Sequence, residues 1–148
     1  MPFAFSRKSQ MRMVGVHPDL ILIFYEALKV SPIDFGIPRD GGLRTAERQN
    51  ELYNQVPAVT RLDGYARKSR HQIDPEISEY GLALDVYAYV NGKASWDKTH
   101  LAIIAGVILS TANRLKAQGR VSIGIRWGGT FGSDNFRGWD YPHFEAVL

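Results

Sequence analysis

The sequence predicts an α+β fold in which helices pack on one side of a small antiparallel sheet. Residues 81–90 and 121–127 alternate between aliphatic side chains and small or polar ones, the two-residue period of a half-buried strand. Between them, residues 96–118 repeat apolar side chains at the three- and four-residue spacing of an amphipathic helix. The chain has 148 residues and 45% hydrophobic content. This length can bury a core, so we expect one domain over residues 1–148.

The first half of the chain carries further helix and strand signals. A helix is expected from Pro18 to about Val30, because proline suits the first helical position and Asp19 places negative charge in the first turn. Residues 33–37 are expected to form a short strand. Thr45 is a suitable N-cap for a second helix that runs to about Gln55.

Signals in the second half complete the predicted sheet. A long loop without a clear period, residues 56–70, leads to His71. The pair Asn91-Gly92 predicts a tight turn after the first alternating strand, and Gly119 predicts the end of the long helix. A last strand is expected to carry His143 and Glu145 on one face.

Composition restricts the possible partners. A net charge of +3 and a pI near 9.3 fit an anionic polymer but not the dense basic patch of a nucleic-acid binder. No apolar run is long enough to cross a membrane, and no apolar segment of a signal peptide follows the N-terminal residues. We therefore expect no nucleic-acid partner, no membrane insertion and no cleavable signal peptide.

The candidate chemistry lies in two histidines and one aspartate. Asp85 lies on the non-aliphatic face of the predicted strand, where a carboxylate is costly to desolvate unless a cation or several hydrogen-bond donors meet it. His71 precedes this strand and His143 lies in the last one. The chain has no cysteine, and two imidazoles with one carboxylate and an open fourth position are typical of a catalytic zinc site. His17 precedes the proline that begins a helix, and His100 lies inside the long helix without a partner at ligand spacing, so both are expected to be ordinary surface or core residues.

These residues form a pattern that resembles a known family. The chain contains Ser69-x-His71, Gly81-x-Ala83-x-Asp85 and Asp140-x-x-His143. This order resembles the Ser-x-His, Gly-x-Ala-x-Asp and (Asp/Glu)-x-x-His signature of zinc DD- and LD-peptidases related to D-Ala-D-Ala carboxypeptidases. Within that family it looks most like the phage endolysins that cut the L-alanyl-D-glutamate bond.

The resemblance covers roughly residues 16–148. The segment Gly42-Leu43-Arg44-Thr45, followed by Gln49, is similar to the family's Gly-x-Arg-Thr segment. One departure is a longer spacing between the first histidine and the aspartate. The extra residues, within 73–80, are polar and turn-rich, which suits a surface insertion.

The resemblance implies a fold of the LAS or hedgehog type and one Zn²⁺ per chain, with His71, Asp85 and His143 as its ligands. Zinc-activated water would attack the peptide bond, with Asp140 as the general base. Arg44 would either stabilise the oxyanion or hold a substrate carboxylate, and both roles remain open.

Three further residues receive expected roles. Ser69 and Gln49 are expected to bind substrate. Glu145 is expected to accept a hydrogen bond from a ligand imidazole.

The function implied by the resemblance is a peptidoglycan endopeptidase, an endolysin that hydrolyses the L-alanyl-D-glutamate bond of the stem peptide. Such an enzyme would be made in the host cytoplasm, reach the periplasm after holin-type release and act as a monomer. Two alternatives stay open: a D-Ala-D-Ala carboxypeptidase of the same fold, and a non-catalytic module that binds the cell wall.

Overall fold

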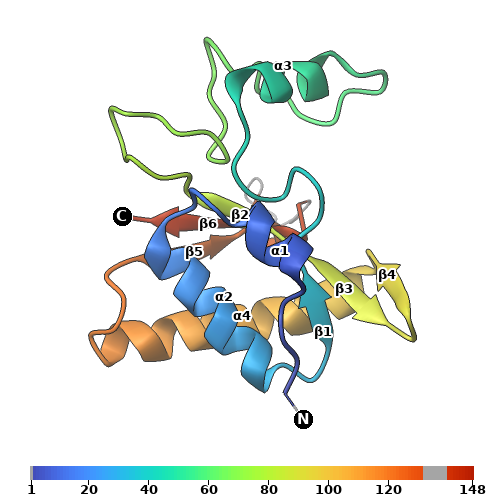
Figure 1. The fold of residues 1–148 in the computed structure, drawn as a ribbon, viewed down its shortest axis with the longest axis vertical. Coiled ribbons are helices and arrows are strands. Elements are labelled where there is room, and N and C mark those ends of the chain that lie inside the picture. The colour runs from blue at the N-terminus through green and yellow to red at the C-terminus, as the bar shows by residue number, and fades with distance from the viewer. Residues whose placement is uncertain (1, 132–139) are drawn as a thin grey trace.

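The structure is a computed structural model that describes residues 2–131 and 140–148, and Figure 1 shows the arrangement of its elements. In chain order these are α1 (Arg7–Arg12), α2 (Pro18–Val30), β1 (Asp34–Gly36), α3 (Ala46–Asn54), β2 (Ala83–Asp85), β3 (Tyr87–Val90), β4 (Lys93–Ser95), α4 (Lys98–Ala117), β5 (Gly124–Trp127), the 3₁₀ turn η1 (Gly128–Thr130) and β6 (His143–Val147).

The strands form two antiparallel sheets, ordered β1-β3-β4 and β2-β6-β5. The prediction of one continuous strand over residues 81–90 is therefore wrong, because β2 and β3 lie in different sheets. The backbone N–H of Asp85 donates to Gly41, and that of Val86 donates to Pro142. These contacts take the chain out of one sheet and into the next.

The two long helices α2 and α4 lie together on one side of the sheets, as the sequence predicted (Figure 1). Their apolar faces pack against the inner faces of the strands in a single buried cluster. In this cluster the ring of Phe24 from α2 packs edge-on against Phe144 from β6, with ring centroids 5.6 Å apart. The face of β2-β6-β5 away from the helices is left for the polar residues of those strands.

Several predicted boundaries are confirmed and two are corrected. Helix α2 spans the predicted residues, and Thr45 caps α3 by accepting from the Arg48 N–H. Helix α4 begins at residue 98 rather than 96, because the Asp97 side chain caps it. Strand β5 begins at residue 124 rather than 121, because the Ser122 N–H and hydroxyl donate to the Asp19 carboxylate instead of to a neighbouring strand.

Two elements were not predicted. Helix α1 has no apolar periodicity of its own that would indicate it, and the Ser6 side chain caps it. Strand β4 completes a hairpin with β3 through the predicted turn, in which Asn91 and Gly92 both have positive φ.

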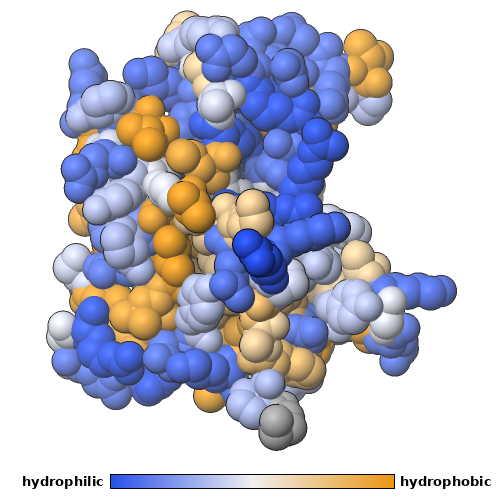
Figure 2. Space-filling model, viewed as in Figure 1, coloured by the Kyte–Doolittle hydropathy of each residue, from blue (hydrophilic) through white to orange (hydrophobic). Residues whose placement is uncertain are grey.

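Helix α3 and the loops around it lie at the opposite end of the molecule from α2 and α4 (Figure 1). Only Gln49 and Leu52 of this helix are buried, and Figure 2 shows a mainly hydrophilic surface over this region. Arg48 ties the helix down through two hydrogen bonds to the Asp40 carboxylate. Within the two described ranges, no helix is long and apolar enough to cross a membrane.

Candidate metal centre

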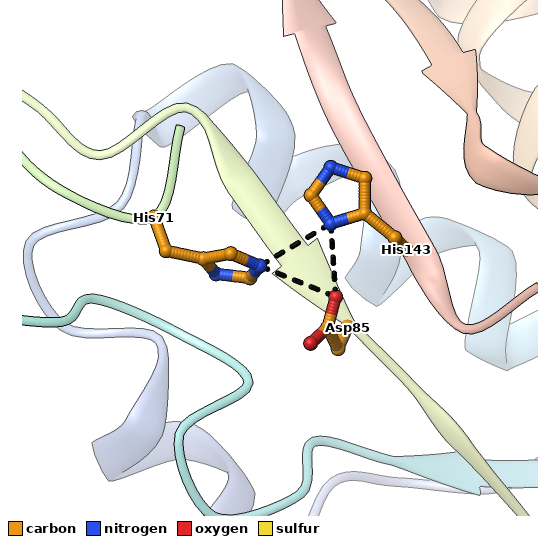
Figure 3. A group of neighbouring side chains, drawn as sticks. All are labelled: His71, Asp85 and His143. Atoms are coloured by element: carbon orange, nitrogen blue, oxygen red, sulfur yellow. Dashed lines mark hydrogen bonds and ion pairs between the residues drawn. The ribbon is translucent and has the colours of Figure 1, made fainter. Parts of the chain in front are cut away.

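His71, Asp85 and His143 converge from three separate places in the chain (Figure 3). Asp85 is the last residue of β2 and His143 the first of β6, and the two are partners in the ladder between these strands. Their side chains therefore leave the same face of the sheet. His71 reaches the same point from the loop before β2.

The three facing atoms form a nearly equilateral triangle. The His71 Nε2 atom lies 3.2 Å from His143 Nδ1 and 3.3 Å from Asp85 Oδ1, and His143 Nδ1 lies 3.1 Å from the same oxygen. Ligands at 2.0–2.1 Å from a tetrahedral zinc ion are about 3.3 Å apart. The triangle therefore has the size that three protein ligands of one zinc ion require.

The hydrogen bonds of each imidazole fix which nitrogen faces the centre. The His71 Nδ1–H donates to the carbonyl of Gly42 at 2.9 Å, which leaves Nε2 with a lone pair. On His143 the assignment is reversed, since Nε2–H donates to Glu145 Oε1 at 3.0 Å and leaves Nδ1 free to coordinate. Two nitrogen lone pairs and a carboxylate oxygen thus point at one place, which is the environment of a cation.

Backbone contacts hold His71 in this position. Its N–H donates to the Ser69 hydroxyl, and its carbonyl accepts from the Arg44 N–H. A Cβ at Gly42 would overlap the carbonyl oxygen of Arg12, so only glycine allows residue 42 to run this close to α1 while its carbonyl meets the imidazole.

The charges at the centre are strongly coupled. Burial alone would raise the pKa of Asp85, but the two histidines outweigh burial and hold that pKa well below its usual range. Burial opposes a charge on His143, but its hydrogen bonds to Asp85 and Glu145 raise the pKa to about 9. In the metal-free chain His143 therefore carries a second proton at neutral pH, on Nδ1, and a metal ion would have to displace this proton before Nδ1 could coordinate.

Arg44 contacts the oxygen of Asp85 that does not face the histidines. Its Nη2 lies 3.4 Å from Asp85 Oδ2, its Nη1 donates to Gln49 Oε1, and its Nε donates to the carbonyl of Asp40. The guanidinium has five N–H groups, so two are not used by these contacts. Arg44 is placed both to orient Asp85 and to offer donors to a bound group.

Asp140 lies beside the centre, three residues before His143. Its backbone N–H donates to Gly128, and its carbonyl accepts from the His143 N–H. Burial raises the pKa of its carboxyl group, and the nearby Asp85 raises it further. A carboxylate with a raised pKa is suited to accept a proton at neutral pH.

Ser69 and Gln49 lie inside the protein rather than on an open surface. Ser69 is 7% exposed and Gln49 is fully buried. The Gln49 amide donates to Thr60 and to Leu62 while its oxygen accepts from Arg44. Their contacts favour a role in positioning His71 and Arg44 over direct contact with a substrate.

A cleft of about 480 Å³ opens beside the centre, between the start of α3 and the loop before β2. Arg44 lines it, together with Leu43, Tyr65 and Lys68. None of the three converging residues lines it, so we regard it as adjoining the centre rather than containing it.

Two features of the site were not found in the sequence. The Gly42 carbonyl that orients His71 could not be found, because every residue carries a carbonyl. The sequence pattern placed Arg126 on the polar side of a predicted strand but did not indicate a role for it in the site. It pairs with Glu145 across β5 and β6, which places it on the same face as His143.

Comparison with known proteins decides the family. The family model for phage L-alanyl-D-glutamate peptidases matches residues 1–147. This chain belongs to that family. An L-alanyl-D-glutamate peptidase of Escherichia phage T5 is 30% identical over 100 residues, which are 66% of this chain and 62% of the phage T5 protein. The chain therefore matches less than two thirds of that relative's length.

A solved structure confirms the fold. The Serratia marcescens L-Ala D-Glu endopeptidase ChiX superposes with a TM-score of 0.71 and 28% identity, over 97% of this chain and 90% of the other. The predicted α+β architecture of the LAS type is thereby confirmed. The residues of the His-Asp-His centre are those that the family pattern indicated.

Proposed function

We propose that this protein is a zinc endopeptidase that hydrolyses the L-alanyl-D-glutamate bond of peptidoglycan stem peptides. The observation that carries the proposal is the triangle of His71 Nε2, Asp85 Oδ1 and His143 Nδ1, whose edges of 3.1 to 3.3 Å suit one tetrahedral zinc ion. Family membership supplies the substrate class.

Zinc at this site would act as a Lewis acid that makes a water molecule acidic near neutral pH and polarises the scissile carbonyl. Asp140 accepts the proton of the attacking water and passes it to the leaving amide nitrogen. The remaining N–H groups of Arg44 stabilise the negative charge that develops on the carbonyl oxygen. Glu145 and the Gly42 carbonyl keep the two imidazoles in the required tautomers.

Ser69 and Gln49 complete the proposal as positioning residues. Ser69 orders the turn that presents His71, and Gln49 holds Arg44 against the loop after α3. We further propose that the whole chain acts as one catalytic domain and reaches the cell wall after release from the host cytoplasm.

The test is digestion of purified peptidoglycan followed by mass spectrometry of the released fragments. The proposal predicts stem peptides that begin with D-glutamate and glycan chains that end in L-alanine. Release of D-alanine alone would instead indicate a carboxypeptidase. Tight binding to the wall without any release would indicate a non-catalytic module.

A further inference from the structure

Two arginines flank the metal centre on the open face of the sheet β2-β6-β5. Arg126 of β5 is the ladder partner of Glu145, so its side chain leaves the same face as His143 and Glu145. Arg70, next to His71, approaches Glu145 from the other side, with its Nε 3.5 Å from Glu145 Oε2. Glu145 thus lies between the two guanidinium groups.

Each guanidinium has five N–H groups, so both arginines keep donors beyond their interaction with Glu145. The two Glu145 oxygens already face His143 and Arg70. Arg126 adds to the positive charge around that carboxylate, while its guanidinium stacks on the Phe131 ring, 4.4 Å from its centroid. The same ring packs against His143 at a centroid distance of 5.6 Å. Phe131 therefore holds an exposed cation beside the metal centre.

Two other cations near the centre in the described part of the chain, Arg44 and Lys98, are less suited to bind an anionic group of the substrate. Arg44 is only 10% exposed at its side chain and already contacts Asp40, Gln49 and Asp85. Lys98 lies at the start of α4, with its Nζ 5.2 Å from the Tyr141 ring centroid. Lysine is a point charge, whereas arginine offers the planar fork that matches a carboxylate.

The proposed substrate carries such a carboxylate next to the cleaved bond. In the stem peptide D-glutamate continues the chain through its side-chain carboxyl group, so its α-carboxylate is free. That group is attached to the carbon that also bears the nitrogen of the scissile amide. A cation that recognises it must lie beside the metal centre, as Arg126 and Arg70 do.

We propose that Arg126, assisted by Arg70, binds the free α-carboxylate of the D-glutamate residue at the cleaved bond. This inference rests on the proposed function and concerns how the enzyme recognises the residue that follows the cleaved bond. The contact exists in the bound ground state as well as during reaction, so its loss should raise KM more than it lowers kcat.

The test compares two synthetic stem peptides that differ at one group, D-glutamate with a free α-carboxylate and D-isoglutamine with the corresponding amide. The wild-type protein should prefer the carboxylate by about 10-fold or more in kcat/KM, the value of a charge-assisted hydrogen-bond pair. Arg126→Gln should lose most of this preference through a higher KM for the carboxylate peptide. Arg126→Lys should recover only part of it.

The control is Arg120→Gln, which removes an arginine that pairs with Glu26 on the surface of the helices and should keep the wild-type preference. Thermal unfolding and zinc content of all variants should match the wild type. Equal cleavage of both peptides by the wild-type protein would overturn this inference and leave the proposed function standing, whereas cleavage of neither would overturn both. A preference that survives Arg126→Gln but disappears in Lys98→Gln would assign the carboxylate to Lys98 instead.

Discussion

Each imidazole of the candidate centre donates a hydrogen bond from one ring nitrogen and can coordinate a metal through the other. The Gly42 carbonyl accepts from Nδ1 of His71, and Glu145 accepts from Nε2 of His143. His71 therefore faces the centre with Nε2, and His143 faces it with Nδ1. Asp85 is divided in the same way, with one oxygen toward the histidines and the other toward Arg44. Each of the three candidate ligands therefore has a partner that sets its direction.

Asp140 is the residue whose role is separated most cleanly from metal binding. Asp140→Asn keeps the shape of the side chain but removes its ability to accept a proton. We expect a folded protein with the wild-type zinc content and almost no hydrolysis of peptidoglycan. Elemental analysis and a turbidity assay on the same sample make the distinction. Loss of zinc from this variant would show that Asp140 is a ligand rather than a base.

Arg44 should contribute to the reaction through its donors. Arg44→Ala should lower kcat/KM by an amount equivalent to roughly 2 to 4 kcal/mol, the range for loss of an oxyanion donor. Arg44→Lys should recover little, because an ammonium group cannot span Asp40, Gln49 and Asp85 together. Steady-state kinetics on a defined stem peptide measures both variants, and full activity of Arg44→Ala would exclude the proposed role.

At the scale of the element, the centre lies where the chain leaves one sheet for the other. Val86 is fully buried and continues the aliphatic alternation of its neighbours, so nothing local in the sequence marks the break between β2 and β3. The break depends on the contact with Pro142, which is distant in sequence. Elements bounded by a local signal were predictable instead, as Pro18, Thr45 and Asn91-Gly92 show.

The segment around Gly42 supports His71, because its carbonyl accepts a hydrogen bond from the imidazole. Gly42→Ala places a Cβ against the carbonyl oxygen of Arg12, so the segment must shift and its carbonyl must move away from His71. Loss of such an outer partner typically weakens metal affinity by about 10- to 100-fold. Competition with a chelator for zinc measures this loss.

A matched control is available within α4. A Cβ at Gly106 would meet nothing within 4 Å, and the residue lies on the exposed face of α4, away from both ends of the helix. Gly106→Ala should leave zinc affinity unchanged and raise the free energy of unfolding by about 0.5 to 1 kcal/mol. Equal zinc affinities for the two variants would remove the role assigned to the Gly42 carbonyl.

At the scale of the whole molecule, two sheets share one core with α2 and α4, and the centre lies on the side of β2-β6-β5 that these helices leave open. The three candidate ligands were predictable because each lies in a short motif of the family pattern, although the spacing between His71 and Asp85 is longer than in the family. The arginines beside Glu145 were not, because their approach depends on the register of β5 against β6 and on the path of the loop that carries Arg70. The spacing of residues along the sequence does not predict the strand register or the path of that loop.

Elemental analysis of the purified protein shows whether His71, Asp85 and His143 hold one zinc ion. The wild-type protein should contain about one zinc per chain, and Asp85→Ala, which removes one of three ligands, should contain almost none. Unfolding should also occur at lower temperature after chelation, because a metal bound here would join the His71 loop to the sheet and stabilise only the folded state. A wild-type protein without zinc, or one whose zinc content is unchanged by Asp85→Ala, would show that these three residues do not form a zinc site.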